Sequence, residues 1–278
     1  MRTKTLLIAA AALAVGIISS EAQVYSQNVV GYYNVPIPGT SSSTGFQIVA
    51  NQLNCGVSNG LNEVFANGGL ISDVNGSENS IVLIWDPIGA SYAAYQYFNA
   101  LDATADGYVG GAGFYDGGGG YITTIIPTGS SVFIQNLAGT NITIPIVGSV
   151  AQGTNYIYMG GAADVGQLSM VGSPIPVSTN VVSAPISFAG NSDVNASYND
   201  NILIWDPVGG SFAAYQYFNA IDAAADSYVG GAGFYDGGGT FQTTAVTLPV
   251  GVGFFIQSFG GAANAGASET WTNIFKVQ

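Results

Sequence analysis

Three Asp carboxylates that occur twice are the residues best suited to chemistry. The six residues are Asp102, Asp106, Asp116, Asp222, Asp226 and Asp236. A hard cation such as Ca²⁺ takes six to eight oxygen ligands from carboxylates, carbonyls and water, which an acidic loop rich in Gly supplies. We therefore treat the trio as candidate calcium ligands, although its spacing matches neither an EF-hand nor a glycine-rich calcium repeat. The alternative is that Asp and Asn stand here because they cap turns.

Aromatic residues with amide neighbours form a second candidate site. The candidate ligand-binding residues in both copies are Tyr95, Gln96, Tyr97, Asn99, Tyr115, Tyr215, Gln216, Tyr217, Asn219 and Tyr235. Exposed Tyr rings flanked by Asp, Asn and Gln suit sugars, because the ring contacts C–H edges while polar groups bond the hydroxyls. The alternative is packing, since residues of a strand alternate between two faces and rings occur on both.

Catalysis has little support in this composition. The chain contains no His, so the usual serine, cysteine and zinc hydrolase sites are missing a central group. Cys55 stands alone and is predicted to be a small buried thiol. The Gly-rich stretches 110–113 and 117–120 have no following helix signal and no Lys or Arg, which argues against a phosphate loop. Paired-carboxylate chemistry is compatible with the composition, but no Asp stands out. We expect no enzyme activity.

The elements that carry these residues are duplicated. Residues 85–124 recur as residues 205–244, and only nine positions differ: 88, 90, 92, 101, 104, 107, 120, 121 and 122. Gln96, Asn99, Asp102, Asp106 and Asp116 are kept in both copies although a hydrophobic core does not require them. A shared site explains their retention, and so does a recent partial duplication. Both explanations remain open.

The chain is predicted to be all-β, with two tandem repeats of antiparallel strands in a sandwich-like arrangement and only short helical turns. It holds 40 Gly, 16 Tyr and 14 Phe, and short apolar runs are separated by Gly, Asn, Asp and Pro. The helical turns are expected at 61–65, 100–105 and 220–225. The strands are expected at 24–35, 46–53, 80–85, 92–98, 121–126, 132–135, 141–147, 168–175, 201–205, 212–218, 241–246, 253–257 and 270–277.

The predicted division is a signal peptide at 1–22, a first repeat at 23–160 and a second at 161–278. The extension of the repeat rests on Phe133–Gln135 matching Phe255–Gln257 and on Phe46–Asn51 aligning with Leu168–Ser173, where only Val49 and Val171 agree. The strand at 24–35 has no evident counterpart in the second repeat, unless Asn155–Met159 takes that place.

The N-terminus has the features of a secretory signal peptide. Arg2 and Lys4 precede an apolar run at 6–18, and Ser20-Glu21-Ala22 fits a cleavage site. The run is too short to span a bilayer, and no other segment is long enough. Removal of the peptide leaves one basic residue, Lys276, against 15 acids, since Arg2, Lys4 and Glu21 are lost from totals of 3 and 16. This charge excludes nucleic acid as a partner. We expect export, to the cell surface, the medium or the periplasm.

Several segments together resemble a family of exported bacterial proteins. They are the signal peptide, NVVGYYNV at 28–35, FQIVANQL at 46–53, the repeated WDP, YxYF and FYDGG motifs, GVGFFIQ at 251–257, and TWTNIFKV at 270–277. The resemblance is to secreted two-repeat β proteins of environmental Gram-negative bacteria. It implies the same β architecture and supplies no catalytic residue. The turn expected before the last strands of each repeat, Pro-Gly-x-Gly-Phe-Phe, is altered here in both copies.

Two functional hypotheses follow. The leading one is a secreted, non-catalytic structural or cell-surface protein able to self-associate, with itself or other extracellular matrix components as partners. Its basis is low charge density, high Gly and aromatic content, and almost no Lys to protect strand edges. The alternative is an extracellular carbohydrate-binding module that uses the Tyr/Asp surface, with glycans as partners and Ca²⁺ as its cofactor. No other cofactor is expected.

Overall fold

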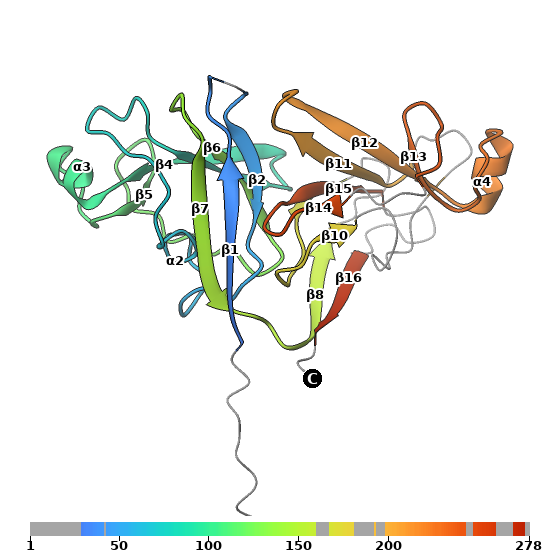
Figure 1. The fold of residues 1–278 in the computed structure, drawn as a ribbon, viewed down its shortest axis with the longest axis horizontal. Coiled ribbons are helices and arrows are strands. Elements are labelled where there is room, and N and C mark those ends of the chain that lie inside the picture. The colour runs from blue at the N-terminus through green and yellow to red at the C-terminus, as the bar shows by residue number, and fades with distance from the viewer. Residues whose placement is uncertain are drawn as a thin grey trace, which may run out of the picture.

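The computed structural model describes residues 29–41, 43–159, 167–180, 192, 198–242, 247–259 and 269–275. The predicted signal peptide lies outside these residues. The described chain is mostly β, with antiparallel sheets in a sandwich-like arrangement, which confirms the predicted fold class (Figure 1). Its helices are short and coincide with the three predicted turns: α2 (Leu61–Val64), α3 (Ala100–Ala105) and α4 (Ala220–Ala225).

Two five-stranded antiparallel sheets form the body of the molecule, and their strand orders correspond. The first sheet has the order β2-β6-β3-β4-β5, with β2 (Phe46–Ala50), β6 (Ser131–Gln135), β3 (Ile81–Asp86), β4 (Ser91–Phe98) and β5 (Gly113–Tyr115). The second has the order β9-β15-β11-β12-β13, with β9 (Gln167–Val171), β15 (Phe254–Ser258), β11 (Asn201–Asp206), β12 (Ser211–Phe218) and β13 (Gly233–Asp236).

The strand registers correspond as well. Phe46 pairs with Gln135 in the first sheet, and Leu168 pairs with Gln257 in the second. Trp85 pairs with Tyr92, and Trp205 pairs with Phe212. Because a slip of one residue would turn every side chain to the other face, matching registers place equivalent side chains on equivalent faces.

Three two-stranded antiparallel sheets complete the fold. They are β1 (Val30–Ile37) with β7 (Ile142–Ser149), β8 (Gly153–Met159) with β16 (Glu269–Phe275), and β10 (Thr179–Asn180) with β14 (Thr247–Leu248). β8 therefore relates to β16 as β1 relates to β7. Residues 155–159, which lie in β8, are therefore the counterpart of the strand at the start of the first repeat. β8 lies just before the predicted division between the repeats at residue 160.

One face of each five-stranded sheet is covered by a two-stranded sheet. In β1, Tyr33, Val35 and Ile37 are buried while the alternate residues are exposed, as expected for a two-stranded sheet with one solvent-exposed face. These side chains pack in one cluster with Val82 and Ile134 of the first sheet. In the second half, Ile157 and Met159 of β8 pack with Ile202 and Ile256.

The opposite faces of the two five-stranded sheets pack against each other. Ile48 and Phe133 of the first sheet meet Met170 and Phe255 of the second. The two Trp residues bond across this contact. Trp85 Nε1 donates to the Leu168 carbonyl at 2.8 Å, and Trp205 Nε1 donates to the Phe46 carbonyl at 3.0 Å. The Trp residues are thus anchors between the two sheets.

The edges of the two sheets also meet. Ala50 N donates to the Gly251 carbonyl at 2.8 Å, and Gly172 N donates to the Gly129 carbonyl at 2.9 Å. A side chain at Gly172 would collide with Ala50, so the backbones can approach this closely only because that residue is Gly.

Among the described residues, one predicted strand is wrong, and the strand expected at 241–246 lies mostly outside them. Residues 121–126 contribute only isolated bridges, at Tyr121 and Ile125. Their backbone groups are used by single bonds to different segments: Ile122 N to Phe114, Leu61 N to Thr124, and Ile126 N to Asn59. The segment follows the sheet edge without forming a continuous ladder.

We predict that Trp85→Phe lowers the free energy of unfolding by about 1–3 kcal/mol, because it leaves the Leu168 carbonyl without its donor. Trp205→Phe should cost a similar amount, since its bond to Phe46 is equivalent. Denaturant unfolding of both variants measures the effect. Unchanged stability in both would contradict the anchoring role.

Candidate functional site

The polar residues kept in both copies gather at the start of α3 and α4. Asn99 is the N-cap of α3, and its Oδ1 accepts from Leu101 N at 2.8 Å and Asp102 N at 3.0 Å. Its Nδ2 donates to Asp102 Oδ2 at 2.7 Å. The Ser72 hydroxyl donates to the same carboxylate oxygen and accepts from Asn99 N at 3.0 Å. The cluster fixes the loop that contains Ser72 to the first turn of the helix.

The second copy repeats this cluster bond for bond. Ser192 Oγ donates to Asp222 Oδ2 at 2.5 Å, and Asn219 Nδ2 donates to the same oxygen at 2.7 Å. Asn219 N donates to Ser192 Oγ at 2.9 Å. Asp102 and Asp222 are buried, so these bonds replace the water that each carboxylate loses.

Ser72 and Ser192 are not among the site residues predicted from the sequence. A signal was available, because Ser-Asp-Val-Asn occurs at 72–75 and again at 192–195, with the same offset of 120 as the duplicated block. The duplication therefore also includes residues 72–75 and 192–195. Their first residue, Ser72 or Ser192, joins Asn and Asp in each cluster.

The other conserved carboxylates have separate local roles. Asp116 Oδ1 accepts from Gly118 N at 2.9 Å and Gly120 N at 2.8 Å, which closes the turn after β5. Asp236 closes the equivalent turn with Gly238 N and Thr240 N. The bond from the Thr240 amide is the main cause that lowers the pKa of Asp236. The remaining two residues end the helices as C-caps: Asp106 and Asp226.

The predicted calcium site is therefore not assembled. Among the residues that the structure describes, no three His, Cys, Asp or Glu side chains come close enough together to hold a metal ion. The physical reason is that the carboxylates of Asp102 and Asp116 bond their own helix start and turn, while Asp106 stands at the helix end, and the second copy is the same. The alternative explanation, that Asp and Asn cap local structure, accounts for Asp102, Asp106 and Asp116 and for their copies.

Tyr115 and Tyr235 are not available to a ligand, contrary to prediction. Both rings are buried, and each hydroxyl donates at 2.6 Å to a backbone carbonyl, that of Gly111 or Gly231. Tyr115 stacks on Tyr108 with ring centroids 4.9 Å apart. These rings form the small core that attaches the helix to the sheet edge.

The remaining predicted ligand residues also belong to the β framework. The half-buried rings of Tyr95, Tyr97, Tyr215 and Tyr217 pack against the cores beneath the two-stranded sheets. Gln96 and Gln216 stand at ladder positions opposite Tyr115 and Tyr235. Asn99 and Asn219 are the helix caps. The structure therefore brings most of these residues together through packing, and it does not combine them into an open Tyr/Asp surface.

Both ends of the molecule carry exposed apolar side chains instead. Leu101 and Val109 are 83% and 89% exposed, and their counterparts Ile221 and Val229 are 79% and 88% exposed. Figure 1 places α3 and α4, which carry Leu101 and Ile221, at opposite ends of the long axis. We call these residue pairs the two apolar tips.

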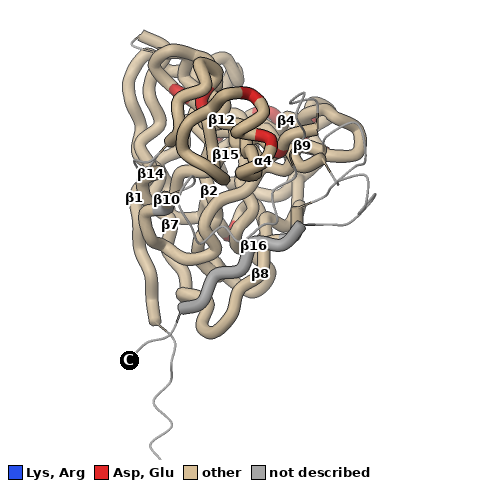
Figure 2. Tube along the Cα trace, turned by 90° about the vertical axis from the view of Figure 1, so that its right-hand side faces the viewer, with Lys and Arg blue, Asp and Glu red and all other residues tan. Residues whose placement is uncertain are grey.

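The surroundings of the tips contain no positive charge. No Lys or Arg occurs among the described residues, and in Figure 2 only Asp and Glu colour the chain. Any partner that needs basic residues for recognition has none to contact on the described surface.

Cys55 is buried, as predicted. Its Sγ lies 3.6 Å from the Leu53 carbonyl and 3.7 Å from Asn51 Oδ1. Burial, and secondarily the negative charge of Glu63, raises the pKa of the thiol to about 11. The group is therefore protonated at neutral pH, and a thiol is a poor nucleophile in that state.

Comparison of the chain with protein-family models, with curated proteins and with solved structures gave no match. In the described part of the chain, no helix has the length and apolar character needed to cross a bilayer.

We expect Asn99→Ala to reduce the free energy of unfolding by about 1 kcal/mol, the usual cost of a lost N-cap. Asn219→Ala tests the second copy. Thr104→Ala is the matched control, because the second copy already has Ala224 at that position. The capping role is refuted if chemical denaturation finds Asn99→Ala no more damaging than the control.

The raised pKa of Cys55 gives a pH dependence of stability. The protonated thiol contributes fully below the ordinary pKa of 9.0, and the contribution disappears as the pH rises toward about 11. The stability of the wild type relative to Cys55→Ala should therefore fall over this range. Denaturant melts at several alkaline pH values measure the difference, and a pH-independent difference would rule out the shift.

Proposed function

We propose that the protein is an exported, non-catalytic structural protein that associates end to end through its two apolar tips. The observation that carries this proposal is the retention of exposed apolar side chains at both ends. Leu101 corresponds to Ile221 and Val109 to Val229, and each of these four side chains is more than three quarters exposed. Burial of a Leu, Ile or Val side chain contributes about 1.5–3 kcal/mol, so contact between tips is favourable.

The placement of the tips supports an open chain of molecules. A surface that pairs with its own copy closes a dimer when a protein has one such surface. Here equivalent surfaces stand at opposite ends (Figure 1), so a molecule bound at one tip still offers the other. Repetition of the contact gives a linear assembly, which suits a structural role outside the cell.

The charge of the protein sets the conditions for this assembly. All charged side chains of the described residues are acidic, so neighbouring molecules repel one another. Salt screens this repulsion over a Debye length of about 10 Å at 0.1 M, and it leaves the apolar contact intact. Association should therefore increase with ionic strength, the opposite of an assembly held by ion pairs.

The glycan-binding alternative has less support. It required an accessible surface of Tyr and Asp, whereas Tyr115 and Tyr235 are buried and the carboxylates of Asp116 and Asp236 bond their own backbone turns. Export is part of the same proposal and rests on residues 1–22 of the sequence.

We predict that substitution of one tip limits the assembly to dimers. In Leu101→Gln or Ile221→Gln, one competent tip remains, so two molecules can pair and growth stops. The double variant should be monomeric, whereas the unaltered protein forms longer species. Light scattering across concentration and salt measures this series on the form that begins at Gln23, with intact mass confirming the N-terminus.

Val57→Gln is the matched control, because Val57 is fully exposed and lies outside both tips. It should assemble like the unaltered protein. A monodisperse monomer for the unaltered protein at all concentrations would refute self-association, and growth of the double variant would show that the tips are not the contact.

A further inference from the structure

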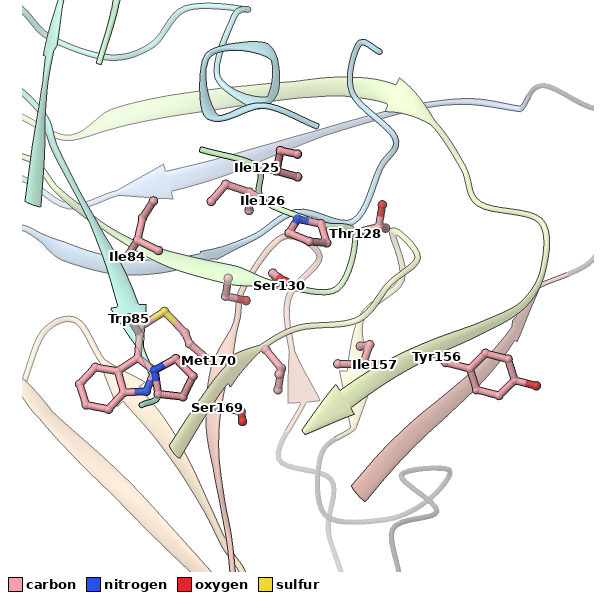
Figure 3. A pocket seen from close by; sticks show the side chains of 14 residues that line it. Ile84, Trp85, Ile125, Ile126, Thr128, Ser130, Tyr156, Ile157, Ser169 and Met170 are labelled. Atoms are coloured by element: carbon pink, nitrogen blue, oxygen red, sulfur yellow. The ribbon is translucent and has the colours of Figure 1, made fainter. Parts of the chain in front are cut away.

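A cleft of about 390 Å³ lies where the two halves of the molecule meet. Ile84 and Trp85 of β3 form one wall, and the segment that leads into β6 forms another. Residues of β8 and β9, including Ile157 and Met170, complete the lining (Figure 3). Its size falls within the range of small-molecule sites, about 300–1,000 Å³.

The lining is apolar and uncharged. Ile, Met, Val and Trp side chains are interrupted only by hydroxyl groups, among them those of Ser130 and Ser169, and no acidic or basic residue contributes. Trp85 presents its ring with Nε1 already bonded to the Leu168 carbonyl. A charged ligand would lose its hydration here without gaining a partner of opposite charge.

The duplicated architecture provides an internal comparison for this cleft. Position 130 is equivalent to 252, since Ser130 bridges Val171 as Val252 bridges Val49. Position 169 is equivalent to 47, because Ser169 follows Leu168 in β9 as Gln47 follows Phe46 in β2, and Leu168 and Phe46 make equivalent strand pairs. The cleft side thus has two Ser residues where the other side has the larger Val252 and Gln47.

The other side is closed by two side chains, those of Gln52 and Tyr33, whereas on the cleft side Gly129 N, the equivalent of Gly251 N, donates to the Asn51 backbone carbonyl at 2.7 Å. Gln52 Oε1 accepts from Gly251 N at 2.8 Å, and the Tyr33 hydroxyl donates to the Ala50 carbonyl at 2.7 Å. Pro174 stands at the position equivalent to Gln52, two residues after Gly172, and has no side-chain acceptor. The opening is therefore a local difference between two otherwise matched junctions.

Two hydroxyl groups of the lining are accessible from the cleft. Ser130 and Ser169 are both partly exposed, so a hydroxyl group on a bound molecule can exchange hydrogen bonds with them. The neighbouring Ser131 hydroxyl is buried against Gly172 and Gly253 and is not accessible in this way.

We propose that this cleft binds one uncharged, ring-sized and mostly apolar molecule that carries a hydroxyl group. The apolar walls accept the ring, the absence of charge excludes ions, and the partly exposed hydroxyls of Ser130 and Ser169 bond the hydroxyl. Since the walls come from both halves, the bound molecule stabilises their junction. This binding is independent of association through the tips.

The test uses cyclohexanol and phenol as probes, with glucose and benzoate as the polar and charged comparisons. Cyclohexanol and phenol should show saturation transfer from the protein in NMR and raise the melting temperature with concentration, because they bind the folded state. Glucose and benzoate should do neither. Absence of any effect of the first two, or equal binding of benzoate, would overturn the proposal.

Two variants locate the site. Ser130→Val and Ser169→Gln install the residues of the equivalent positions 252 and 47, so the fold should tolerate them while the cleft is filled. Each should abolish binding. Ser211→Val, at an exposed position outside the cleft, should bind like the unaltered protein. Unchanged binding in both filled variants would place the probes elsewhere.

Discussion

The contact between the inner faces of the two five-stranded sheets is the interaction on which the rest of the structure depends. Each sheet has apolar side chains on both faces, and its two-stranded sheet covers only one of them. In the described part of the chain, the other face packs against the equivalent face of the second sheet, with Phe133 near Trp205 and Phe255 near Trp85. Neither half alone would exclude water from its inner face. We therefore regard the two halves as one folding unit.

This contact also explains what the duplicated block preserves. Trp85 and Trp205 must stand at the strand end to reach the carbonyls of the opposite sheet. Asn99, Asp102 and Ser72 form the cap that holds each helix at the sheet edge, and Asp116 closes the following turn. Asn99, Asp102 and Asp116, which are kept in both copies, therefore each stabilise local structure in their own copy. Their retention does not require a shared ligand site.

Function is better sought where the copies are exposed or where they differ. The apolar tips are equivalent and unpaired in the described molecule, which suits association between molecules. The cleft exists because Ser130 and Ser169 replace larger residues at one of two junctions. Duplication thus produces two kinds of surface: repeated ends that favour assembly, and a single irregular junction that favours a small ligand.

The sequence alone determined the β class, most strands and all three helical turns, because alternation, Asn caps and Gly or Pro breaks act over a few residues. It failed for β5 and β13, which are short, begin at Gly and pair with the preceding strands β4 and β12 across an intervening helix and loop. It likewise failed for Tyr115, Asp102 and the strand expected at 121–126. Whether a Tyr is exposed, or whether carboxylates converge, depends on which segments pack together. Those contacts join residues far apart in the chain, and only the tertiary structure decides them.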